Sequence, residues 1–115
     1  MQAAADHLVT RLELLAPQGL SNVLWSFATL RVMRKDLNQA AIMRAQEIVD
    51  DFAAQGLANI VWALARMREK DEGLMQAISA AAMAKIDDFK AMELANLATG
   101  FAKLGIRDAP LMVAI

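Results

Sequence analysis

A short apolar phrase recurs along this chain at a fixed interval. Residues 18–25 read QGLSNVLW, residues 55–62 read QGLANIVW, and residues 92–99 carry the weaker copy MELANLAT. The asparagines inside the copies are Asn22, Asn59 and Asn96, so successive copies lie 37 residues apart. A period of roughly 20–50 residues is typical of proteins built from stacked repeats. We therefore expect repeats at about 1–36, 37–73 and 74–110, with the start of a fourth at 111–115.

Each repeat divides into two expected helices. Alanine, leucine and methionine, which are good helix formers, dominate the chain, and proline occurs only at positions 17 and 110. Helix A is expected at about 2–15, 38–52 and 75–89, and helix B at about 18–31, 55–68 and 92–104. Apolar positions in helix A step by three and four, as on one helical face. The prediction is one all-α domain over 1–115, a right-handed α-solenoid of antiparallel helix pairs.

Composition argues against most other classes of protein. The chain has no cysteine and a single histidine, and its net charge is −1. No apolar run approaches the roughly 20 residues of a membrane-spanning helix. No phosphate-binding glycine loop, histidine-based triad or metal-ligand spacing is present. We therefore expect no enzyme activity, no cofactor or metal, no small-molecule substrate and no membrane partner.

The apolar run at 111–115 matches the opening of another helix A. We expect the chain to be part of a longer array, and this last run to be its least stable helical segment.

The two best copies of the phrase carry a family resemblance. PQGLSNVLWSFATL at 17–30 and AQGLANIVWALARM at 54–67 resemble the signature of octotricopeptide repeats. They are also similar to the leucine-rich helical regions of FAST-kinase-like proteins and to proteins of organellar RNA-editing substrate-binding complexes. The third copy departs from the signature, with Thr99 in place of tryptophan and Met92-Glu93 in place of Gln-Gly.

The resemblance implies a module that binds single-stranded RNA in an organelle, with the mitochondrial matrix favoured over the chloroplast. It implies a role in transcript processing or stability, with protein partners also possible. The alternative is a protein-interaction scaffold with an armadillo-like peptide-binding groove.

The recurring polar and aromatic residues each allow two interpretations. The amides of Asn22, Asn59 and Asn96 either join one repeat to the next or contact a ligand chain. Trp25 and Trp62 either pack in the core, which we expect, or stack on nucleotide bases.

The outward positions of helix A vary between repeats, as one-base-per-repeat recognition would require. They include His7 and Arg44 in one column and Thr10 and Glu47 in another. The alternative is that these side chains simply face solvent.

Basic residues gather near the end of helix B. Arg31, Arg66, Arg68 and Lys103 are predicted to form a phosphate track along one edge of the array. Acidic residues gather instead at the end of helix A. Cations at helix C-termini also suit the helix dipole, which is the alternative explanation for this pattern.

Overall fold

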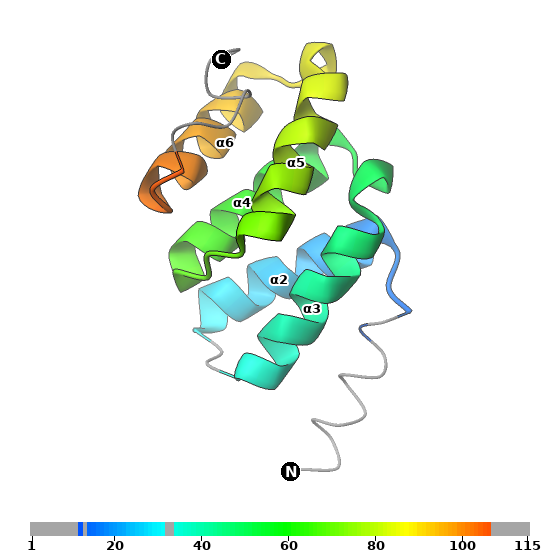
Figure 1. Ribbon diagram of the computed structural model, residues 1–115, viewed down its shortest axis with the longest axis vertical. Helices are drawn as coiled ribbons and strands as arrows, with labels where there is room; N and C mark the ends of the chain where they lie inside the picture. Colours follow the sequence, from blue (N-terminus) through cyan, green and yellow to red (C-terminus); the bar gives the residue numbers. More distant parts are fainter. Residues whose placement is uncertain (1–11, 13, 32–33, 107–115) are drawn as a thin grey trace.

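Every regular element in the described part of the chain is a helix. The computed structural model describes residues 12, 14–31 and 34–106 (Figure 1). Its elements are α2 (Pro17–Leu30), α3 (Lys35–Glu47), η1 (Val49–Asp51), α4 (Ala54–Met67), α5 (Glu72–Ala84), η2 (Ile86–Asp88) and α6 (Ala91–Lys103). Within these residues there is no strand, which confirms the all-α prediction.

The bounds of the elements recur at the interval found in the sequence. Adding 37 to the bounds of α2, α3 and η1 gives those of α4, α5 and η2. The second and third A helices begin three residues earlier than predicted, because the charged residues just before the predicted starts, among them Asp36 and Glu72, already belong to the helices. In α5, for example, the Asp71 carboxylate accepts a hydrogen bond from the Leu74 N–H at 2.8 Å and caps the helix. The two described A helices, α3 and α5, are each followed by a separate 3₁₀ turn, η1 and η2.

The B helices α2, α4 and α6 begin and end in similar ways. Each begins after an extended residue with ψ near 165°, and Pro17 opens α2 at a position that needs no backbone N–H. Arg31 and Arg68 follow α2 and α4 with φ of 56° and 57°, and Gly105 follows α6 with φ of 75°. Two of the three left-handed positions are therefore occupied by arginine rather than by the glycine that such a conformation favours.

The helices form two layers (Figure 1). One layer contains α2, α4 and α6 in chain order, with α4 packed against both of its neighbours, and the other contains α3 packed against α5. The middle helix α4 is therefore covered on several sides. Its buried residues are Ala54, Leu57, Ala58, Ile60, Val61, Ala63 and Leu64. Full burial of one such leucine contributes roughly 1.5–3 kcal/mol, so contact between repeats supplies much of the stability.

One glycine sets the closest approach between α4 and α6. A Cβ added to Gly100 would collide with the Val61 side chain and lie 3.2 Å from the Val61 carbonyl oxygen. The equivalent position in α4 is Ala63, which is fully buried. Only the smallest side chains fit where adjacent B helices touch, so the spacing between these helices is fixed by backbone contact.

Among the described residues, no helix is long and apolar enough to cross a membrane. The expectation for the run at 111–115 concerns residues outside those that the structure describes.

Candidate nucleic-acid interface

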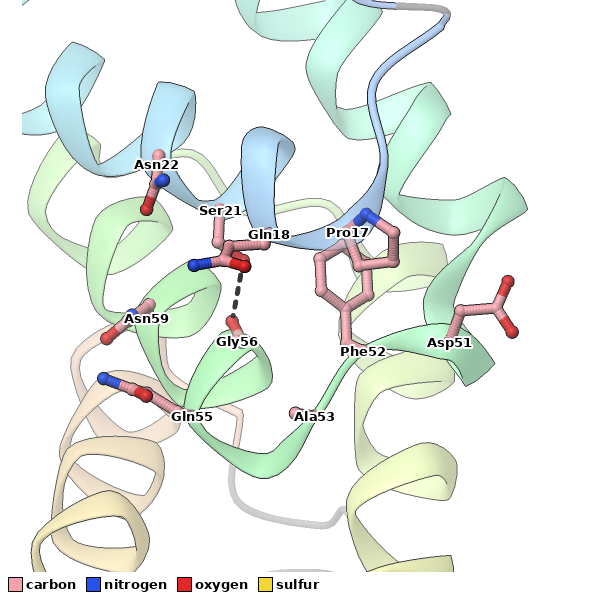
Figure 2. Close-up of a pocket in the computed structure, with 10 residues that line it drawn as sticks. All are labelled: Pro17, Gln18, Ser21, Asn22, Asp51, Phe52, Ala53, Gln55, Gly56 and Asn59. Atoms are coloured by element: carbon pink, nitrogen blue, oxygen red, sulfur yellow. Dashed lines mark hydrogen bonds between the residues drawn. The ribbon is translucent and has the colours of Figure 1, made fainter.

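Four amide side chains line a groove between α2 and α4. Gln18 and Asn22 come from α2, and Gln55 and Asn59 come from the equivalent positions of α4. The cavity has a volume of about 370 Å³, and Figure 2 shows the four amides along one side of it, which we call the amide groove. Near its floor the Ser21 hydroxyl donates to the Gly56 carbonyl oxygen at 3.4 Å.

The three repeated asparagines do not share one cavity. Asn22 and Asn59 line the amide groove, whereas Asn96 lines a smaller cavity between α4 and α6. None of the three amides forms a hydrogen bond with another residue of the described chain. Their assignment as junction or ligand groups stays a prediction.

Two tryptophans stack on each other beside the amide groove. The ring centroids of Trp25 and Trp62 are 6.1 Å apart, with 21° between the ring planes, which is an offset-stacked geometry. The Arg66 guanidinium carbon lies 5.4 Å from the Trp62 ring centroid. We call this group the tryptophan stack.

The prediction that both tryptophans pack in the core is wrong for Trp25. That side chain is 47% exposed, and Trp62 is half-buried against the edge of the core. Because α2 and α4 lie side by side, positions 25 and 62 meet at the rim of their contact rather than beneath it. About half of Trp25 is therefore accessible from solvent.

The four residues of the predicted phosphate track lie at the C-terminal ends of the B helices. Arg31, Arg66 and Arg68 line one open cavity of about 380 Å³. Arg66 and Lys103 line the next cavity, between α4 and α6. Arg66 belongs to both, so the four cations follow one edge of the α2–α4–α6 layer. We call this edge the basic end.

Cations of the basic end differ in pairing from other cations nearby. Arg34 and Lys70 form ion pairs with Asp36 at 2.7 Å and Glu72 at 3.6 Å. The hydrogen bond from Arg34 lowers the pKa of the Asp36 carboxyl, as expected for a paired carboxylate. Within the described residues, the four cations of the basic end form no ion pair, so their charge is available to a ligand.

Arg44 and Glu47, predicted to recognise bases, lie on α3 in the other layer. The Arg44 Nε donates to the Leu15 carbonyl oxygen at 3.1 Å, and its Nη1 lies 3.9 Å from the Glu47 carboxylate. The expectation that this column faces outward is wrong for its third member, Ala81, which is only 3% exposed, and Arg44 itself is half-buried. Glu47 is exposed, and His7 and Thr10 lie outside the described residues.

A lysine that sequence patterns did not single out has a contact similar to that of Arg44. The Lys85 Nζ donates to the carbonyl oxygens of Asp50, at 2.7 Å, and of Phe52. Phe52 is the repeat equivalent of Leu15, so Arg44 and Lys85 bind equivalent carbonyl groups of the preceding repeat. They come from non-equivalent columns, 44 and 48 in the second repeat, so the repeat pattern alone could not reveal the shared role.

No cluster of three or more His, Cys, Asp or Glu side chains suited to a metal ion occurs within the described ranges. The groups at this surface are amides, indole rings and cations that form no ion pair with the part of the chain that the structure describes.

Comparison with known proteins supplies the family. The model of the RNA-editing substrate-binding complex 6 protein family matches residues 1–115, the whole chain. The chain belongs to that family. Comparisons with curated proteins and with solved structures gave no match.

Membership in this family confirms one part of the predicted resemblance. The similarity to proteins of RNA-editing substrate-binding complexes is borne out, whereas the octotricopeptide and FAST-kinase-like similarities rest on the repeated phrase alone. The family is named for a complex that binds the substrates of RNA editing, which is consistent with a role in organellar RNA processing.

Proposed function

We propose that this chain is a module that binds single-stranded RNA within an organellar RNA-processing assembly. It acts by binding, without catalysis, and its fold is a right-handed α-solenoid with a 37-residue repeat. The recurring element bounds and the row of B helices support the solenoid. The RNA-editing family supports an organellar assembly with RNA and protein partners, and we place this assembly in the mitochondrial matrix rather than the chloroplast.

The observation that carries this proposal is the junction of the basic end with the tryptophan stack. Arg66 lies over the Trp62 ring and also lines a cavity with Arg31 and Arg68. Proteins that bind single strands combine cations that follow the phosphates with aromatic faces on which bases stack. Both features meet here at one side chain.

The remaining groups lie on the same face of each B helix. On α4 the residues Gln55, Asn59, Trp62 and Arg66 step by four, three and four, which places them along one side of a helix. From Gln55 to Arg66 this side spans about 17 Å at the usual helical rise. A strand running along this side of α4 would therefore meet amides, an aromatic ring and a cation in order.

A second function is favoured by the amide groove. Its four amides both donate and accept hydrogen bonds, which suits the backbone of an extended peptide in an armadillo-like scaffold. Peptide binding there would not require the cations of the basic end, so the two functions differ in their dependence on salt.

Titration of a labelled single-stranded RNA pool with the 115-residue chain, followed by fluorescence anisotropy at several salt concentrations, tests the proposal. The double variant Arg66→Gln/Lys103→Gln should bind all sequences more weakly, because phosphate contacts position a strand without recognising its bases. The salt slope should become shallower by about 1.4, at roughly 0.7 per lost phosphate contact on a single strand.

The matched control is Arg34→Gln/Lys70→Gln. It removes the same amount of charge from cations that are already paired with Asp36 and Glu72. If both double variants weaken binding equally, only overall charge matters and the phosphate track is wrong. If the unmodified chain has no RNA affinity at low salt, the peptide scaffold becomes the better assignment.

A further inference from the structure

The two junctions in the layer of B helices are filled differently. Between α2 and α4 the indole of Trp62 stacks on the indole of Trp25. Between α4 and α6 the equivalent position is Thr99, 37 residues after Trp62. A third ring that would continue the tryptophan stack is therefore missing from the chain.

A cavity occupies the place of the missing ring. It has a volume of about 150 Å³ and lies between Trp62 and Arg66 of α4 and Asn96, Thr99 and Lys103 of α6. We call it the Thr99 slot. Its volume is well below the roughly 300–1,000 Å³ of sites for drug-sized ligands, which suits a single small ring system.

The slot cannot close by movement of α6 toward α4. Gly100, next to Thr99, already places its Cα against Val61, and the Val61 carbonyl oxygen lies 3.2 Å from a Cβ built there. Backbone contact therefore fixes the distance between the two helices, and replacing an indole by threonine leaves space beside Trp62.

We propose that a nucleobase of the bound single-stranded RNA occupies the Thr99 slot and completes the stack that Trp25 and Trp62 begin. This inference rests on the proposed function and adds the position at which one base is held. The Trp62 ring and the Arg66 guanidinium both line the slot, and both kinds of group stack on bases. Trp25 does not line it, so the stack presents its Trp62–Arg66 end to the base.

Polar groups of the slot suit the edge and the phosphate of a nucleotide. The Asn96 amide and the Thr99 hydroxyl can donate and accept hydrogen bonds at a base edge. Arg66 and Lys103, which form no ion pair within the described residues, supply positive charge beside them. A side chain from a protein partner could fill the space, but an aromatic or arginine side chain brings no anion for these two cations.

Replacement of Thr99 by tryptophan is the direct test. Thr99→Trp restores the repeat pattern and fills the slot with the chain's own ring. We expect RNA affinity to fall at least five-fold, since stacking of one base is worth on the order of ten-fold in affinity. The salt slope should stay unchanged, because no phosphate contact is removed. The control is Ala95→Trp, which adds the same side chain at an exposed position of α6 that does not line the slot.

A second measurement needs no variant. Single-stranded RNA containing 4-thiouridine, bound to the unmodified chain and irradiated, should form cross-links at Trp62 or within residues 96–103. Normal RNA affinity of a folded Thr99→Trp variant, together with cross-links only outside the slot, would overturn this inference and leave the phosphate track intact. Absence of any RNA binding by the unmodified chain would overturn both proposals.

Discussion

Cationic side chains have different partners at the two ends of the helix pairs. At the end where the A helices finish, Arg44 and Lys85 donate to backbone carbonyl oxygens of the preceding repeat. At the opposite end, Arg31, Arg66, Arg68 and Lys103 form no ion pair with the described chain and line two open cavities. The first group joins repeats, and the second is available to a ligand.

The difference follows from the backbone at each end. The segments just before α2 and α4 contain carbonyl groups that have no partner in a next turn of helix. A cation from the following repeat donates a hydrogen bond to the Leu15 carbonyl oxygen in one case and to the Phe52 carbonyl oxygen in the other. At the opposite end, α4 and α6 satisfy their last carbonyls through their own backbone, since the Glu69 and Ile106 N–H groups donate to Leu64 and Phe101, both at 2.9 Å.

The largest effect on stability is expected when Lys85 is replaced. Lys85→Met keeps the length of the side chain but removes the donor to Asp50 and Phe52. Hydrogen bonds from charged groups contribute about 1.5–3 kcal/mol, so the free energy of unfolding should fall by about 2 kcal/mol. Urea denaturation followed by circular dichroism measures this change. RNA affinity of the folded variant should be unchanged, and a clear loss of affinity would contradict the division between the two ends.

A smaller loss of stability is expected when Arg44 is replaced. Arg44→Met removes one hydrogen bond, to the Leu15 carbonyl, and the weak pairing with Glu47 at 3.9 Å. The free energy of unfolding should fall by about 1–2 kcal/mol. Base preference, measured with the four homopolymers, should not change. Unaltered stability with a changed base preference would instead support the base-recognition role predicted from the sequence.

These two residues show what the sequence could and could not supply. The helices follow from apolar spacing, which depends only on neighbouring turns, and the row of B helices follows from the recurrence of the same pattern every 37 residues. The partner of Arg44 is a carbonyl oxygen 29 residues earlier, and that of Lys85 is 33 residues earlier. No helical pattern encodes such a contact, because it depends on how one repeat packs on another.

The candidate site was likewise predictable only where it depends on spacing along the helices. The shared edge follows from the spacing of the repeats, because helices of similar length end at similar places. This edge contains Arg31, Arg66, Arg68 and Lys103. The exposure of Trp25 depends on whether α2 and α4 meet at position 25 or beside it. The helical wheel places Trp25 among alanines on the stacking side of helix B, which favoured the core, but it does not give the depth of that position in the contact.

The smallest effect on stability, and of opposite sign, is expected at Arg68. This residue has φ of 57°, and the equivalent position after α6 is Gly105 with φ of 75°. A non-glycine side chain in the left-handed region costs about 1–2 kcal/mol. Glycine removes this cost but loses more backbone entropy on folding, so only part of it is recovered. Arg68→Gly should therefore raise the free energy of unfolding by about 0.5–1 kcal/mol while the Glu69 to Leu64 hydrogen bond is kept.

The same substitution should weaken RNA binding. It removes one cation of the basic end, so the salt slope should become shallower by about 0.7. Arg68→Lys is the matched control, since it keeps the charge and the left-handed strain together. A more stable protein with weaker RNA binding would mean that arginine occupies this position for its ligand rather than for the fold. If glycine lowers stability instead, Arg68 belongs with Arg44 and Lys85 among the residues that hold the repeats together, and the contrast between the two ends fails at this position.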